Sequence, residues 1–145
     1  MRKLFLFGCV VLVAMVAVLA CGGDADDDEA SVDREVVVRT DDTLRFEPDE
    51  VRVRVGERVR LVADNREGLQ LHDFSVERIA AGEVEVEGAD HAHGDTSDYD
   101  LHVAAEAGER GVLVFVAQEP GEYQFFCSVA GHAEAGMTGT IIVEA

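Results

Sequence analysis

Lysine occurs only at position 3 of the 145 residues, cysteine occurs three times, and there is only one long hydrophobic run. The chain also lacks a zinc-type pair of cysteines, a glycine-rich phosphate loop, a Ser-His-Asp set and paired catalytic carboxylates. These absences argue against an enzyme, because each motif is the sequence mark of a common catalytic site. The length is that of one domain. We therefore expect a single small domain that is not an enzyme.

The hydrophobic run lies at the N-terminus, where Arg2 and Lys3 precede an apolar stretch from Leu4 to Ala20. The stretch is near the lower limit for a bilayer-spanning helix, so a retained anchor helix is one interpretation. Residues 18–21, Val-Leu-Ala-Cys, match the cleavage box of bacterial lipoprotein signals, in which the cysteine receives lipid. We predict a signal over residues 1–21 with lipidated Cys21, and an exported domain anchored at the outer face of the cytoplasmic membrane.

Only one of the three cysteines then remains in the predicted domain. Cys9 lies inside the predicted signal and Cys21 is the predicted lipid attachment site, which leaves Cys127 as the single thiol of the domain. A single cysteine in an exported domain cannot form an internal disulfide. Three interpretations remain for Cys127: an inert buried residue, a reactive thiol or a metal ligand.

The charge of the predicted mature chain is strongly negative. Of the 12 basic residues, Arg2 and Lys3 lie in the signal, which leaves 10 arginines against 30 acidic residues and a formal net charge of −20. Such a surface repels nucleic acid and anionic lipid and steers cationic partners toward the protein; alternatively, it maintains solubility. Residues 22–33 are almost purely small and acidic, and we predict that they form a disordered tether.

After residue 34, apolar and charged residues alternate with a period of two. Val51, Val53 and Val55 alternate with Arg52 and Arg54, the pattern of a half-buried strand with arginine on the wet face. Pro48, Gly56 and other turn residues separate such runs. No helical stripe is longer than a turn or two, so we predict an all-β antiparallel sandwich. The expected strands cover residues 36–38, 51–55, 59–61, 69–77, 101–104, 111–117, 122–127 and 138–143.

Residues 80–100 do not fit this pattern. They are rich in Gly, Ala, Asp and Glu, and we predict a long loop with a short hairpin around residues 84–86. His91 and His93 stand two apart in this loop among aspartates. Two hypotheses remain for this pair, a weak secondary copper or zinc site and a solvated polar loop, and composition favours the loop. His102 follows in a predicted strand, where we expect a structural role.

Three residues near the C-terminus carry the chemistry. Cys127, His132 and Met137 follow one another with four residues between each pair, on a predicted loop between two strands. Thiolate, imidazole and thioether are ligands that copper prefers, and a blue-copper site consists of two histidines and a cysteine with a distant methionine. The second histidine must come from another part of the chain. His72 in a predicted strand is the best candidate.

These residues resemble the cupredoxins, the family of plastocyanin, azurin and auracyanin. Residues 46–59 look like the opening hairpin of the family, and the Cys-x4-His-x4-Met spacing looks most like that of auracyanin. The resemblance covers the predicted domain, residues 34–145. It implies a Greek-key β-sandwich of about seven to eight strands that binds one copper ion, which cycles between Cu(I) and Cu(II).

The resemblance also implies a role for each site residue. Cys127, His72 and His132 would form the ligand plane, and Met137 would be the weak axial ligand. Asp73 and Ser128 match positions that hydrogen-bond across the two ligand loops. A flat patch of small residues would surround His132, comprising Ala130, Gly131, Ala133, Ala135 and Gly136.

The sequence also excludes the related copper proteins that hold more than one copper ion. The binuclear copper centre of cytochrome oxidase needs a second cysteine where this chain has Gly131. Multicopper oxidases use several His-x-His pairs, and this chain has one. Copper nitrite reductases need a second domain and a second copper.

The predicted function is that of a membrane-tethered carrier of single electrons. Its partner would be another redox protein, such as a basic cytochrome or a membrane oxidoreductase, and we expect a monomer. The alternative is copper capture and delivery with the same fold. A third, weaker hypothesis is a domain accessory to a larger respiratory complex.

Overall fold

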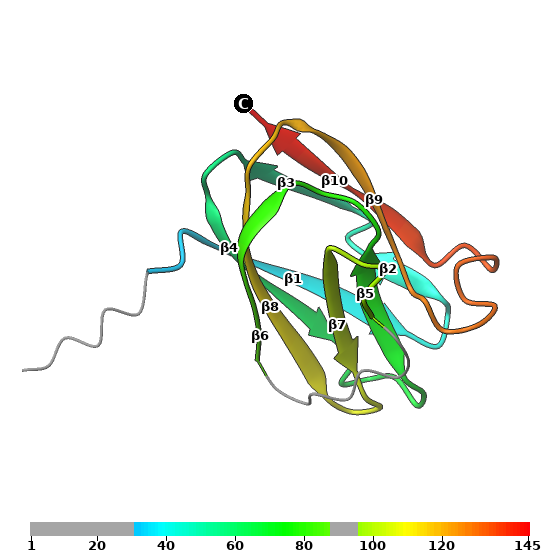
Figure 1. Ribbon diagram of the computed structural model, residues 1–145. Helices are drawn as coiled ribbons and strands as arrows, with labels where there is room; N and C mark the ends of the chain where they lie inside the picture. Colours follow the sequence, from blue (N-terminus) through cyan, green and yellow to red (C-terminus); the bar gives the residue numbers. More distant parts are fainter. Residues whose placement is uncertain (1–30, 88–95) are drawn as a thin grey trace, which may run out of the picture.

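The computed structural model describes residues 31–87 and 96–145, within which ten strands form two five-stranded sheets that enclose one core (Figure 1). The first sheet contains, in spatial order, β2 (Arg45–Glu47), β1 (Arg34–Asp41), β4 (Arg58–Asp64), β8 (Arg110–Ala117) and β6 (Ala81–Glu87). The second contains β3 (Glu50–Arg54), β10 (Thr138–Glu144), β9 (Gly121–Phe126), β5 (His72–Val76) and β7 (Leu101–Ala105). The predicted all-β sandwich is confirmed.

The alternation seen in the sequence sets which side chains enter the core. In β3, Val51 and Val53 are buried while Arg52 and Arg54 are exposed, because successive side chains of a strand point to opposite faces. Buried apolar side chains from both sheets make one continuous cluster. In the described ranges, no helix is long and apolar enough to cross a membrane.

The strand count and the pairing differ from the expectation of seven to eight antiparallel strands. Residues 45–54 form two strands in different sheets, since β2 pairs with β1 and β3 pairs with β10. Pro48 lies between them and has no N–H to continue a ladder, so the chain changes sheet there. The β1–β4 and β3–β10 pairs are parallel, and the other pairs are antiparallel.

The predicted long loop over residues 80–100 is wrong in its first part. Residues 81–87 form β6, an edge strand that pairs with β8, and the hairpin expected around residues 84–86 is absent from this described stretch. Glu83 and Glu85 bind Arg58 at 2.7 and 3.1 Å, so the acidic residues of β6 serve as partners for arginines of the same sheet. Residues 88–95, with His91 and His93, and residues 1–30, with Cys21, lie outside the described residues.

Three phenylalanines fill the part of the core nearest β9. Phe125 stacks on Phe74 with ring centroids 4.5 Å apart and meets the ring of Phe46 edge-on at 5.0 Å. A methyl group on Gly139 would collide with the Phe125 ring, so this β10 position has to be glycine for the ring to pack there. Phe125 lies two residues before Cys127, so this packing anchors the strand that leads into the predicted site.

Asp64 at the end of β4 is a buried carboxylate that two arginines bind. Its side chain is 5% exposed and binds Arg66 at 2.8 Å and Arg110 at 3.2 Å. The hydrogen bonds from Arg66, then from Arg110, hold the pKa of the Asp64 carboxyl well below its usual range. A lowered folded-state pKa contributes stability above the unfolded pKa of about 3.9, and acid removes that stability.

We expect Asp64→Asn to lower the free energy of unfolding at pH 7 by about 1 kcal/mol. The difference from the unchanged protein should shrink as the pH falls from about 5 to 2, because the Asp64 carboxyl of the unfolded chain binds protons in this range while that of the folded protein stays ionised. Urea unfolding at a series of pH values measures this, with Glu119→Gln as an exposed control. A difference that stays constant with pH would contradict the assignment.

Candidate metal centre

The fold brings the four predicted ligands to one end of the sandwich. His72 is the first residue of β5, Cys127 directly follows β9, and Met137 directly precedes β10. His132 lies in the connecting loop, which is the orange to red segment at the edge of the molecule in Figure 1. His72, Cys127 and Met137 are fully buried, and His132 is 8% exposed.

The ligand atoms of three of these residues converge on one point. The Cys127 sulfur lies 3.4 Å from Nδ1 of His132 and 4.0 Å from Nδ1 of His72. The ligand atoms of the three residues lie within 4.8 Å of one another. A trigonal metal with bonds of about 2.0–2.3 Å holds its nitrogen and sulfur ligands about 3.7 Å apart. The observed spacings fit one metal ion between these side chains.

The loop that carries Cys127, His132 and Met137 closes on itself through its backbone. The Cys127 N–H donates to the carbonyl of Met137 at 3.1 Å, and the Met137 N–H donates to the carbonyl of His132 at 3.0 Å. Gly131 and Gly136 have φ of 87° and 100°, a left-handed conformation that a side chain disfavours. The glycines of this loop are therefore required by its tight turns.

Arg45 on β2 holds the same loop from outside. Its guanidinium donates to the carbonyl of Ala135 at 2.9 Å, and it occupies the space that a side chain on Gly136 would need. Arg45 thus connects the first sheet to the segment between His132 and Met137.

Asp73 and Ser128 join the two segments that carry ligands. The Ser128 N–H and hydroxyl each donate to the Asp73 carboxylate at 2.7 Å, and the Asp73 N–H points at the Cys127 sulfur at 3.5 Å. This arrangement is the cross-connection that the family resemblance implies. Because the buried Asp73 carboxylate accepts two hydrogen bonds from Ser128, the pair fixes the position of His72 relative to Cys127.

Burial holds the Cys127 and His72 side chains of the site in their uncharged forms. Burial raises the pKa of the Cys127 thiol to about 11, with a further contribution from the nearby Asp73 charge. Burial also lowers the pKa of His72, which keeps its imidazole neutral and able to bind a metal. A metal must displace the thiol proton when it binds. One thiolate, two imidazoles and a thioether form a donor set that selects copper.

Asp42 was not identified from the sequence. Nε2 of His72, the nitrogen that faces away from the sulfur, has no hydrogen-bond partner, and the nearest carboxylate oxygen is that of Asp42 at 3.8 Å. Metal-ligating histidines commonly direct their second nitrogen at a carboxylate. Asp42 lies in the turn after β1, 30 residues before His72, and no local motif marks it.

Comparison with known proteins agrees with this geometry. Residues 32–144 match the model of the family described as copper binding proteins, plastocyanin/azurin family. A curated relative, the copper-resistant cuproprotein CopI of Rubrivivax gelatinosus, is 34% identical over 120 residues, which cover 80% of this chain and 70% of that protein.

Solved structures show the same fold. Auracyanin B matches with a TM-score of 0.62 at 24% identity, over 79% of this chain and 91% of that one. The auracyanin of Roseiflexus castenholzii matches with a TM-score of 0.61 at 20% identity, over 78% and 98%. A multicopper oxidase also matches, with a TM-score of 0.55 at 19% identity, but this chain spans only 45% of it.

The chain therefore belongs to the plastocyanin/azurin family of copper-binding proteins. Copper is its cofactor, and His72, Cys127, His132 and Met137 are arranged as a type 1 copper site.

Proposed function

We propose that this protein is not an enzyme but carries single electrons through its copper site. The observation that carries the proposal is the unequal exposure of the ligands. Three are fully buried, whereas His132 is 8% exposed and is preceded by the exposed small residues Ala130 and Gly131. A partner could approach the His132 imidazole closely, while the other ligands remain shielded from water.

The rigidity of the site also suits this role. When bound, copper supplies a one-electron couple. The hydrogen bonds between Asp73 and Ser128, the closed loop and the Arg45 contact hold the ligand side chains in one arrangement. Ligands that move little between oxidation states make electron transfer fast, because little reorganisation accompanies it.

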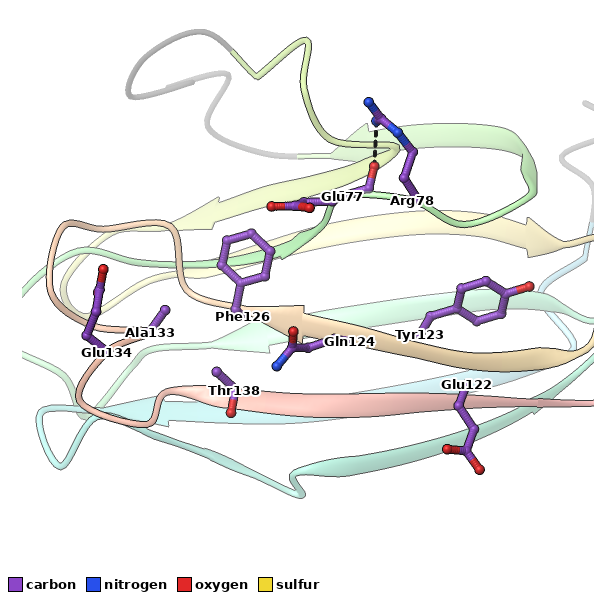
Figure 2. Close-up of a pocket in the computed structure, with 9 residues that line it drawn as sticks. All are labelled: Glu77, Arg78, Glu122, Tyr123, Gln124, Phe126, Ala133, Glu134 and Thr138. Atoms are coloured by element: carbon purple, nitrogen blue, oxygen red, sulfur yellow. Dashed lines mark hydrogen bonds between the residues drawn. The ribbon is translucent and has the colours of Figure 1, made fainter.

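We propose a basic redox protein as the partner, such as a basic cytochrome or a membrane oxidoreductase, with this protein acting as a monomer. A groove of about 600 Å³ lies over β9 beside the ligand loop, and Glu77, Glu122 and Glu134 line it (Figure 2). Phe126, which directly precedes Cys127, projects into the same groove. The acidic lining and the high negative charge favour a cationic surface.

The test is electron exchange between the copper-loaded protein and a basic c-type cytochrome, followed by stopped flow. We expect the rate of electron exchange to fall steeply as the ionic strength rises. At low salt, the double variant Glu77→Gln/Glu134→Gln should exchange electrons more slowly than the unchanged protein. The control variant Glu47→Gln/Glu119→Gln removes the same charge outside the groove, and it should lower the rate of electron exchange less than Glu77→Gln/Glu134→Gln does. Copper that fails to cycle reversibly in voltammetry would refute the carrier proposal.

A second candidate is copper capture or delivery, which the similarity to a copper-resistant cuproprotein favours. The two functions differ in metal exchange. A delivery protein should lose its copper readily to a chelator, whereas a carrier should retain copper through many redox cycles. Incubation with a Cu(I) chelator after each cycle separates them.

We further propose that the chain is exported and attached to a membrane through lipid on Cys21, as residues 18–21 suggest. Mass spectrometry of the N-terminal peptide tests this. An unmodified Cys21 in the membrane-associated protein would refute it.

A further inference from the structure

The Asp73 carboxylate has a third donor besides the two from Ser128. Ser75, on the same face of β5, donates its hydroxyl to the Asp73 carboxylate at 2.9 Å. The Ser75 oxygen also lies 2.9 Å from Nδ1 of His102, and these two residues face each other across the β5–β7 pair. Ser75 is fully buried and Asp73 is 4% exposed. A continuous hydrogen-bonded chain therefore runs from β7 to the residue beside the His72 ligand.

The direction of these hydrogen bonds fixes the state of His102. A serine hydroxyl has one proton, and here that proton goes to the Asp73 carboxylate. The Ser75 oxygen must then accept from His102, so that Nδ1 carries the hydrogen. Burial lowers the pKa of His102, which favours the neutral ring. Nε2 of His102 is buried and has no partner, as expected of a bare lone pair rather than a donor.

We propose that His102 is a positioning residue for the copper site, which acts through Ser75 to hold the Asp73 carboxylate and thereby raises the reduction potential. The Asp73 N–H in turn points at the Cys127 sulfur at 3.5 Å. This proposal depends only on copper binding and not on the electron-carrier function.

The sign of the effect follows from the charges. The chain of donors draws negative charge away from the Asp73 carboxylate and holds its backbone N–H toward the thiolate. Without these hydrogen bonds, more negative charge stays near the metal, and the hydrogen bond from the Asp73 N–H to the Cys127 sulfur weakens. Both changes stabilise Cu(II) over Cu(I), so that the potential falls.

The competing role for His102 is purely structural. Its ring stacks on Tyr99 with centroids 5.6 Å apart, and Tyr99 in turn meets the ring of Phe126. Two substitutions separate the roles, because asparagine retains an N–H near the position of Nδ1 whereas leucine does not. Both substitutions remove the aromatic stack.

We expect His102→Leu to raise the ratio of Cu(II) to Cu(I) affinity by up to about tenfold, where a tenfold change corresponds to about 59 mV for one electron. His102→Asn should keep the original potential, and so should Tyr99→Leu, which removes the ring stack on His102 and leaves the hydrogen bond between His102 and Ser75 in place. Equal shifts in His102→Leu and His102→Asn would overturn the proposal.

A double-mutant cycle tests whether His102 changes the reduction potential through Ser75. Ser75→Ala should lower the potential as His102→Leu does, and adding His102→Leu to Ser75→Ala should change nothing further. Additive shifts would show that His102 does not act through Ser75.

The metal-free protein provides an independent readout that needs no variant to fold. Nitrogen-15 NMR of the histidine side chains should show His102 as the neutral tautomer with hydrogen on Nδ1. Hydrogen on Nε2 instead would overturn the proposal, because Ser75 would then have no donor from His102.

Discussion

The Cys127→Ser variant should lose the intense visible absorption that Cu(II) gives with the unchanged protein. That absorption is charge transfer from a cysteine thiolate to copper, and Cys127 is the one free cysteine in the described part of the chain. Serine fits the fully buried position and its oxygen can still accept the Asp73 N–H. The substitution therefore removes the soft ligand with little effect on the surrounding fold.

The measurement is titration of the purified domain with Cu(II), monitored by visible absorption, with circular dichroism to verify folding. Met137→Leu serves as a matched control in the same loop. It removes the weak axial ligand, so we expect the band to persist and the reduction potential to shift. A visible band of equal strength in a folded Cys127→Ser protein would refute the assignment of Cys127 as the thiolate ligand.

The part of the site that lies on one loop was predictable from the sequence because its spacing is local. Cys127, His132 and Met137 recur at a fixed interval between two strands, and the backbone bonds within the loop bring them together. His72 is more than 50 residues away, and its assignment relied on the family resemblance. The resemblance also indicated Asp73 and Ser128, whose hydrogen bonds cross the same sequence distance.

The remaining contacts could not be predicted because they depend on which distant segments the fold brings together. Arg45 and Ala135 are 90 residues apart, and Ser75 and His102 are 27 apart. Each pair meets only because two segments distant in the sequence become neighbours, and no single-sequence pattern specifies which segments these are. His102 was correctly placed in a strand, but its hydrogen bond to Ser75 depends on the β5–β7 register.

The error over β6 has a different physical cause. In β3 the valines are buried and the arginines are exposed, whereas Val84 and Val86 of β6 are 43% and 53% exposed. This edge strand is held by backbone pairing with β8 and by ion pairs to Arg58 and Arg60 rather than by a buried face. Half-buried alternation therefore does not mark such a strand in the sequence. Ion pairs of this kind form only after the partner strand is in place.

Phe125→Ala should produce the largest loss of stability among the substitutions considered. The Phe125 ring is fully buried and packs against Phe74 and Phe46, so its removal leaves a cavity between the two sheets. Cavities of this size cost about 3–5 kcal/mol, and the lost contacts between rings add about 0.5–1.5 kcal/mol. The space cannot be refilled from β10, because Gly139 has no side chain to move into it.

Urea unfolding of the metal-free protein measures this loss, and Phe126→Ala is the control. Phe126 is the next residue on β9 and points to the opposite face, where it is only half-buried and lines the acidic groove. Its removal should cost much less, and equal losses would contradict the packing described. Copper should bind the folded site more tightly than the unfolded chain, so it should raise the unfolding midpoint of both variants. The visible band of folded, copper-loaded Phe125→Ala should be unchanged, because Phe125 supports the strand that carries Cys127 without being a ligand.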